Sequence, residues 1–242
     1  MIWSKLRSGD LPKELHYKTA FEEFRTECER LMVSCEARVV CEVGAGRSPL
    51  LEVEDVRRLG LDYTLVDISA AELSQAPAGF KTLCLDICSV QSEQIRETFD
   101  FLFSKMVAEH VRSGEAMHRN VYAMLKPGGV AFHFFPTLYH PAFVANYLLP
   151  EIVSRPIVRR FRPHHVKFHA RYSKCFGPTR RMRDFLIGLG YDIVYHRAFY
   201  GTWYFKKVPL LRSLDGALSS WAARRRSPYL TSFAYLALRK PE

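Results

Sequence analysis

Short apolar stretches of strand length alternate with segments of helical periodicity along the first part of the chain. Strand-like stretches lie at 39–43, 62–69, 81–85, 99–104 and 130–135. Between and before them, apolar residues recur at helical spacing over 17–33, 50–59 and 117–125. Strands that alternate with helices are typical of a parallel sheet with helices on both faces. The pattern therefore predicts an α/β fold.

The second part of the chain continues the pattern with two interruptions. Thr179 is placed to cap a helix that ends at Gly190, and strands are predicted over 191–199 and 231–239. The added stretches are 138–178 and 200–227. We expect one domain over 1–242. Its parts are an N-terminal helical segment at 1–35, a core at 36–136, an insertion at 137–178, and a C-terminal part of the sheet at 179–242 that contains 200–227.

The first strand ends in a turn with two glycines. Gly44, Ala45 and Gly46 follow Glu42 and precede a helix, which is the arrangement of a nucleotide-type cofactor site. Glycine lets the backbone adopt unusual φ values and approach a ligand closely. Glu42 would repel a diphosphate and suit a cationic ligand group. A dinucleotide fingerprint would need glycine or alanine where Pro49 stands.

Motifs over 36–136 resemble those of the class I S-adenosylmethionine-dependent methyltransferases. The E-x-G-x-G at 42–46 is similar to motif I, although Ser48 stands where many members have a third glycine, and the LKPGG at 125–129 resembles the junction before the fifth strand. The resemblance implies S-adenosylmethionine as the cofactor. It also implies a Rossmann-like, seven-stranded, mostly parallel sheet with an antiparallel last strand and helices on both faces.

The family pattern assigns cofactor contacts to residues at the ends of successive strands. Asp67 would accept hydrogen bonds from ribose hydroxyls; its alternative role is to cap the next helix together with Ser69. The resemblance places Asp86 at the adenine amino group and Ile87 against the ring. It also places the backbone near Ser104 along the methionine part of the cofactor. The expected cofactor-binding set is Glu42, Gly44, Ala45, Gly46, Asp67, Ile68, Asp86, Ile87 and Ser104.

Histidines provide the candidates for a catalytic base. The resemblance places Glu109 and His110 near the transferred methyl group; the alternative is a surface helix with a satisfied histidine. A hydroxyl acceptor needs a base of near-neutral pKa, so the candidates are His110, then His140 and His165. The acceptor would contact Glu109, His164, His169, Arg171 and Tyr172. The H-H-x3-H spacing at 164–169 lacks companion acids or cysteines, so no metal is expected.

Charge is unevenly distributed. The net charge of +10 divides into −4 over residues 1–150, with 16 Lys/Arg and 20 Asp/Glu, and +14 over 151–242, with 19 and 5. Such asymmetry indicates that the C-terminal part meets an anionic partner. The six cysteines lack CxxC spacing, and Cys41 and Cys84 are expected to be buried thiols. No apolar run reaches the length of a membrane span, and Met1 to Asp10 lacks a signal-type run, which favours the cytoplasm.

The 200–227 stretch combines aromatic, apolar and basic residues. Apolar residues at helical spacing are Leu210, Leu211, Leu214, Ala217, Leu218 and Trp221, and basic residues flank them. This pattern suits a helix at an anionic membrane surface. A helix that covers the sheet, or that forms a dimer contact, would show the same pattern.

These observations favour an S-adenosylmethionine-dependent O-methyltransferase that acts on a sugar or lipid-linked glycan intermediate at the inner face of the membrane. The C-terminal half resembles bacterial methyltransferases of cell-surface glycan and glycolipid pathways. A second hypothesis is a lipophilic quinone-like or small aromatic acceptor. A third is an RNA-binding protein or RNA methyltransferase; nucleic acid is disfavoured because no RNA-binding module and no N-P-P-Y-type motif occurs after the fourth strand. A scaffold that does not bind the cofactor is a further alternative. The oligomeric state is left open.

Overall fold

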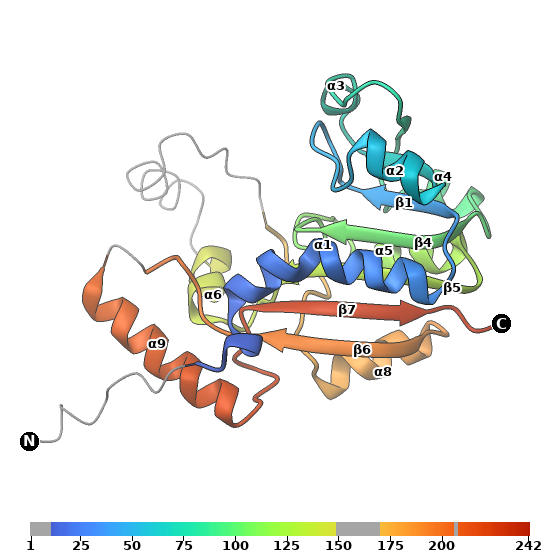
Figure 1. Cartoon of the computed structure of the whole chain (residues 1–242). Helices are drawn as coiled ribbons and strands as arrows, with labels where there is room; N and C mark the ends of the chain where they lie inside the picture. The colour runs from blue at the N-terminus through green and yellow to red at the C-terminus, as the bar shows by residue number, and fades with distance from the viewer. Residues whose placement is uncertain (1–10, 149–169, 206–207) are drawn as a thin grey trace, which may run out of the picture.

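A single seven-stranded sheet organises the described chain (Figure 1). The computed structural model describes residues 11–148, 170–205 and 208–242. Its strands, in the spatial order β3-β2-β1-β4-β5-β7-β6, are β1 (Val39–Val43), β2 (Asp62–Asp67), β3 (Lys81–Cys84), β4 (Phe99–Lys105), β5 (Leu125–Pro136), β6 (Asp192–Phe199) and β7 (Phe233–Arg239). β7 runs antiparallel to both of its neighbours, and the other pairs are parallel. The expected fold class is confirmed.

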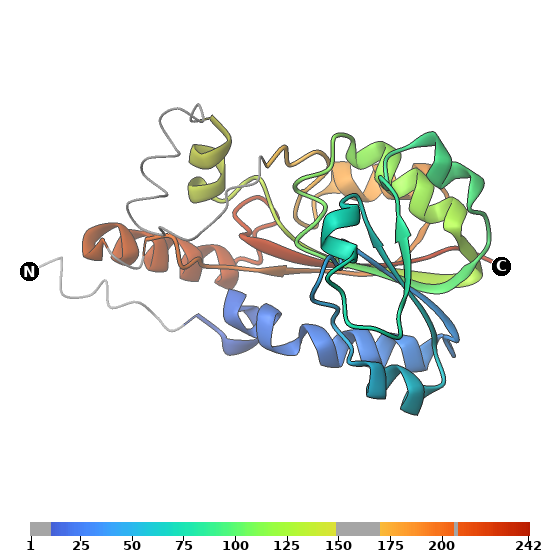
Figure 2. The same ribbon diagram turned by 90° about the horizontal axis from the view of Figure 1, so that it is seen from above.

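Helices cover both faces of the sheet (Figure 2). They are α1 (Tyr17–Ser34), α2 (Val53–Leu59), α3 (Ala70–Leu73), α4 (Val90–Gln94), α5 (Gly114–Met124), α6 (Pro141–Leu148), α8 (Arg180–Gly188) and α9 (Pro209–Arg224), with a 3₁₀ turn, η2, at Lys13–Leu15. Side-chain caps begin several of them. Ser69, Ser113 and Thr179 accept a backbone N–H at the start of α3, α5 and α8, as their positions predict.

The core lies between the central strands and the helices that pack on them. The first predicted helix, 17–33, is confirmed as α1, and its Phe24 is fully buried. The Phe24 ring stacks on Phe132 of β5 at 5.3 Å between centroids. Central parallel strands are buried on both faces, which explains the near-continuous apolar composition of β4 and β5.

Two local predictions are wrong. The LKPGG junction is part of β5 rather than a turn before it, because Leu125 pairs with Phe99 and Gly128 donates its N–H to the Lys240 carbonyl oxygen. Cys84 is exposed, because β3 is the edge strand and only one side of it is paired. All six cysteines are free thiols.

Candidate functional site

The residues that the sequence assigns to a cofactor lie along one edge of the sheet. β1 pairs with β2 and β4, and β2 pairs with β3, so the carboxyl ends of these four strands are neighbours. The segments 44–46, 67–68, 86–87 and 105–110 each begin at the last residue of one of these strands or within two residues after it. In open α/β sheets ligands bind in this position. Figure 1 shows that α6 and α9 lie toward the same edge.

The glycine turn approaches the chain that follows β4. A Cβ on Gly44 would lie 2.2 Å from Val107 Cγ2, and the residue has φ +77°, so a side chain is excluded on two counts. Its N–H donates to the Val66 carbonyl oxygen at 2.7 Å. Gly46 has φ +53°, and a Cβ there would be 3.6 Å from Asp67 Oδ2. The turn thus brings backbone close to Asp67 and leaves no side chain between them.

Glu42 stabilises the chain around this turn through hydrogen bonds. Its carboxylate is 6% exposed and accepts the Tyr63 hydroxyl at 2.7 Å and the Leu50 N–H at 3.0 Å. Burial raises the pKa of Glu42, although these two hydrogen bonds lower it in part. The observed partners lie within the protein. The direct contact of Glu42 with a charged ligand group stays a prediction.

The two acids at the ends of β2 and β3 differ in how their oxygens are used. Asp67 Oδ1 accepts the Ser69 N–H at 2.9 Å, whereas the cap of α3 is the Ser69 hydroxyl, which accepts the Glu72 N–H, and no described residue forms a hydrogen bond to Asp67 Oδ2. Asp86 Oδ1 accepts the Cys88 N–H at 2.8 Å, and Oδ2 lies 3.4 Å from Arg112 Nη2. Asp67 therefore keeps an oxygen for a ribose hydroxyl. Both oxygens of Asp86 have partners within the protein, and one of these partners is the Arg112 guanidinium.

The apolar residues that follow these two acids differ in exposure. Ile68 is 70% exposed, whereas Ile87 is 5% exposed and belongs to the core. Asn120 Nδ2 donates to the Ile87 carbonyl oxygen at 2.8 Å and holds that segment against α5. Of the two, Ile68 is consequently the side chain that solvent can reach. The contact of Ile87 with the adenine ring stays a prediction.

The Ser104 side chain is engaged by the neighbouring strand. It is fully buried, and its hydroxyl lies 2.8 Å from His133 Nδ1 on β5. Any contact of Ser104 with a cofactor would be made by its backbone, as the family pattern implies. His133 also lies edge-on to His118 at 5.5 Å, and burial lowers the pKa of both imidazoles.

Glu109 and His110 form a carboxyl–imidazole pair after β4. Glu109 Oε1 lies 3.6 Å from His110 Nε2, and the His110 side chain is 37% exposed. Glu109 is 2% exposed, and no described residue forms a hydrogen bond to its Oε2. Burial raises the pKa of this carboxyl to about 8. A buried carboxyl with a perturbed pKa beside an accessible imidazole is a candidate acid–base site.

An aromatic shelf adjoins this pair. We define it as Phe143, Tyr147, Tyr172 and Tyr204, in which ring centroids are 6.1 Å apart for Phe143–Tyr172, 6.3 Å for Tyr147–Tyr172 and 5.4 Å for Phe143–Tyr204. The Tyr172 N–H donates to the Glu109 carbonyl oxygen at 3.1 Å, which ties the shelf to the pair. Tyr147 is 50% and Tyr204 45% exposed, so aromatic surface is available to a ligand there.

His140 takes a different position from the one expected of a base. It is 1% exposed at the start of α6, its Nδ1 accepts the Ala142 N–H at 3.3 Å, and Asp215 Oδ1 of α9 lies 3.0 Å from its Nε2 in ion-pair contact. A buried ring with both nitrogens facing protein cannot readily receive a proton from an acceptor. His140 instead links α6 to α9.

Of the other residues expected to contact the acceptor or act as a base, Arg171 is described by the structure and three histidines are not. Arg171 is exposed and its N–H donates to the Glu109 carbonyl oxygen at 2.6 Å. His164, His165 and His169 lie outside the described residues. Within the ranges that the structure describes, no group of three or more His, Cys, Asp or Glu side chains is arranged to hold a metal ion.

Sequence reasoning missed Asp215 and Arg112. A usable signal existed for Asp215, because it is the only acid between 200 and 227, a segment otherwise basic. Arg112 follows the Glu-His pair by two residues and carried no comparable signal.

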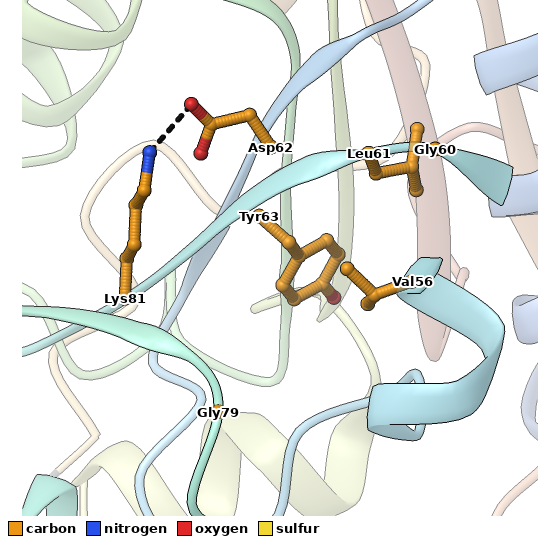
Figure 3. A pocket seen from close by; sticks show the side chains of 7 residues that line it. All are labelled: Val56, Gly60, Leu61, Asp62, Tyr63, Gly79 and Lys81. Carbon is orange, nitrogen blue, oxygen red and sulfur yellow. Dashed lines mark hydrogen bonds and ion pairs between the residues drawn. The ribbon is translucent and has the colours of Figure 1, made fainter. Parts of the chain in front are cut away.

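A separate hollow lies at the opposite edge of the sheet. It is lined by Val56, Gly60, Leu61, Asp62, Tyr63, Gly79 and Lys81, and Lys81 Nζ lies 2.6 Å from Asp62 Oδ2 across its rim (Figure 3). These residues begin β2 and β3 or precede them. The hollow is therefore remote from the strand ends that carry the candidate site.

Comparisons with known proteins agree with this geometry. A family model described as "Methyltransferase domain" matches residues 41–133. A phosphoethanolamine N-methyltransferase 1 from Triticum aestivum is 26% identical over 113 residues, which cover 45% of this chain and 22% of the relative. This chain thus spans about a fifth of that relative's length.

Two further similarities cover more of the chain. A ubiquinone biosynthesis O-methyltransferase from Pseudomonas putida is 29% identical over 171 residues, 66% of this chain and 71% of the relative. The solved structure of Haemonchus contortus phosphoethanolamine N-methyltransferase 2 with S-adenosyl-L-methionine has a TM-score of 0.53 at 15% identity, covering 90% of this chain and 53% of that chain. The structural likeness concerns the fold.

Proposed function

We propose that this chain, a class I S-adenosylmethionine-dependent methyltransferase, methylates a sugar hydroxyl of a lipid-linked glycan intermediate. The observation that supports a hydroxyl acceptor is the Glu109–His110 pair, with 3.6 Å between Oε1 and Nε2. An amine or carboxylate acceptor needs less help from a base than a hydroxyl does. A lipid-linked acceptor would place the reaction at the inner face of the membrane.

The residues at the strand ends fit the cofactor. The backbone of the Gly44 turn, the open Ile68 side chain and the uncommitted Asp67 Oδ2 would hold its methionine part, its ring and its ribose, respectively. The bound cofactor supplies a methyl group already activated by the sulfonium. The protein's own contribution is then to align the acceptor and to exclude water.

His110 would take the proton of the acceptor hydroxyl. Its side chain is partly exposed, so an acceptor can reach it, and the Glu109 carboxyl faces Nε2. An imidazolium formed at His110 would lower the pKa of Glu109 and be stabilised by its carboxylate. The aromatic shelf beside the pair exposes the Tyr147 and Tyr204 rings, against which a sugar or an aromatic ring can pack.

A second candidate acceptor is a quinone-like or phenolic ring with an apolar tail. The similarity to ubiquinone biosynthesis O-methyltransferases and the exposed tyrosines of the aromatic shelf favour it. Both candidates are hydroxyl acceptors carried on lipid, and they differ in the head group alone.

The test is to incubate the purified protein and methyl-labelled S-adenosylmethionine with two probes. One is the glycolipid extract of cells that lack the protein, and the other is a dihydroxybenzene that carries a prenyl tail. Label released by acid hydrolysis as an O-methyl sugar supports the proposal. Label on the aromatic ring alone replaces it with the second candidate, and label in neither probe refutes both. Asp67→Ala, designed to lose the cofactor, is the matched control.

A further inference from the structure

Helix α9 buries its small residues and exposes its large apolar ones. The buried positions are Asp215, Ser219, Ser220, Ala222 and Ala223. By contrast, Leu210 is 69%, Leu211 42%, Leu214 57% and Trp221 44% exposed. An ordinary surface helix turns its apolar stripe to the core. α9 does the reverse.

The exposed apolar residues lie on one side of the helix. Leu210, Leu214 and Trp221 are spaced by 4 and 7 residues, which places them on one stripe, and Leu211 borders it. We call these four residues the α9 outer face. Single exposed apolar residues are common on proteins, whereas a contiguous group marks an interaction site. In Figures 1 and 2 α9 extends beyond the end of the sheet, and no other described helix lies along its outer length.

Basic residues gather at the C-terminal end of the α9 outer face. Arg224, Arg225 and Arg226 are exposed, and none of the three forms an ion pair with a described residue. The Arg225 guanidinium lies 5.1 Å from the centroid of the Trp221 ring. Asp215, the only acid of the segment, is buried against His140 and does not neutralise them. Lys206 and Lys207 lie outside the described residues.

We propose that the α9 outer face docks on an anionic membrane surface. Leucines and a tryptophan on one side of a helix, with three arginines at one end of that side, match the chemistry of the bilayer interface. A second copy of the chain fits less well, because the segment 200–227 has one acid, Asp215, which is buried against His140, so this face of one copy offers no exposed acid to the arginines of the other. RNA fits less well, because the centre of the face is apolar and the cations lie at its margin.

Docking would set the candidate site at the membrane surface. The His140–Asp215 contact joins α9 to the start of α6, which carries Phe143 and Tyr147 of the aromatic shelf. Within the described ranges, no helix is long and apolar enough to cross a bilayer. The helix would therefore lie on the surface. The inference rests on α9 itself and holds whichever acceptor is methylated.

The experiment is sedimentation of the full chain with vesicles of phosphatidylglycerol and phosphatidylcholine, or of phosphatidylcholine alone. We expect binding to the anionic vesicles that weakens from about 50 mM to about 500 mM salt, because surface electrostatics is screened. Leu214→Glu with Trp221→Glu should lower the bound fraction about tenfold, since apolar insertion and charge attraction act together. Val33→Glu with Val90→Glu, at exposed apolar positions on other elements, should leave binding unchanged.

Control measurements test whether each variant is folded and whether a second copy of the chain or RNA binds instead of the membrane. Binding of S-adenosylhomocysteine and thermal unfolding are measured for each variant. If Leu214→Glu with Trp221→Glu unfolds the protein, Arg224→Gln, Arg225→Gln and Arg226→Gln together should still reduce anionic binding. Equal binding to both vesicle types, or vesicle binding unaffected by these changes, overturns the proposal. A wild-type dimer that the Leu214 and Trp221 changes convert to monomer, without vesicle binding, also overturns it, as does retention on poly(U) in place of vesicles.

Discussion

Replacing Glu109 with Gln should increase the free energy of unfolding by an amount that grows with pH. The folded protein raises the pKa of this carboxyl from 4.5 to about 8, because burial disfavours its charged form. At a pH below the pKa of the unfolded state, the carboxyl is neutral in both states and does not change the free energy of unfolding. As pH rises toward the folded value, the unfolded state releases the proton and the folded state retains it, so stability is lost progressively. At a pH above the folded-state pKa, the loss of stability has reached its full size and no longer changes with pH.

The magnitude follows from the two pKa values. Holding a neutral carboxyl at pH 7 costs about 3 kcal/mol relative to a group without a shift. Between about pH 6 and about pH 7.5 the cost grows by about 2 kcal/mol. Glutamine has the same shape and no ionisation, so Glu109→Gln removes this slope. Its amide also loses hydration in the same buried position, but that penalty does not change with pH.

The assay is urea unfolding followed by circular dichroism at several pH values between about 5.5 and 8.5. The difference between Glu109→Gln and wild type should increase across this range and level off above about pH 8. Glu54→Gln, at an exposed position in α2, should give a constant difference. The His110 imidazole is close enough to contribute, so the pair is repeated in the His110→Ala background. A constant difference for Glu109→Gln in both backgrounds would refute the burial argument.

Further predictions concern the cofactor and the base. Asp67→Ala should weaken S-adenosylhomocysteine binding about tenfold or more in calorimetry, because a charge-assisted hydrogen bond contributes about 1.5–3 kcal/mol; unchanged affinity would remove the ribose role. Gly44→Ala should weaken the same binding, and adding Val107→Ala should restore it only in part, since the clash is relieved and the positive φ is not; full restoration would leave φ without a role. His110→Ala should lower kcat in methyl transfer and leave cofactor affinity unchanged, whereas wild-type turnover would make His110 structural.

The strand-end site was the part most accessible to sequence reasoning. Asp67 and Asp86 follow apolar runs, and parallel strands bring their carboxyl ends to one edge, so their neighbourhood follows from topology. What the pattern could not resolve is which side of the chain each next residue faces. Ile68 is exposed and Ile87 is buried, although both stand directly after such an acid.

Contacts between segments distant in sequence were the least accessible part. His140 and Asp215 meet because the start of α6 lies against α9, and neither residue has a local pattern that indicates the other. The histidine was therefore considered a base when its surroundings make it a link between helices. The Tyr172 N–H that reaches the Glu109 carbonyl oxygen is a similar case, because backbone contacts leave no trace in the side-chain sequence.

Helix α9 shows why periodicity alone does not determine what is buried. Its leucines and tryptophan predict one apolar side, and the opposite side is made of serine and alanine. Small side chains let a helix approach neighbouring backbone closely, so contact area there comes from proximity rather than from side-chain size. The turn around Ala222 and Ala223 packs with Tyr200 in this way. The side of α9 with serine and alanine is therefore the buried one. The α9 outer face, with its leucines and tryptophan, remains exposed and available to a partner.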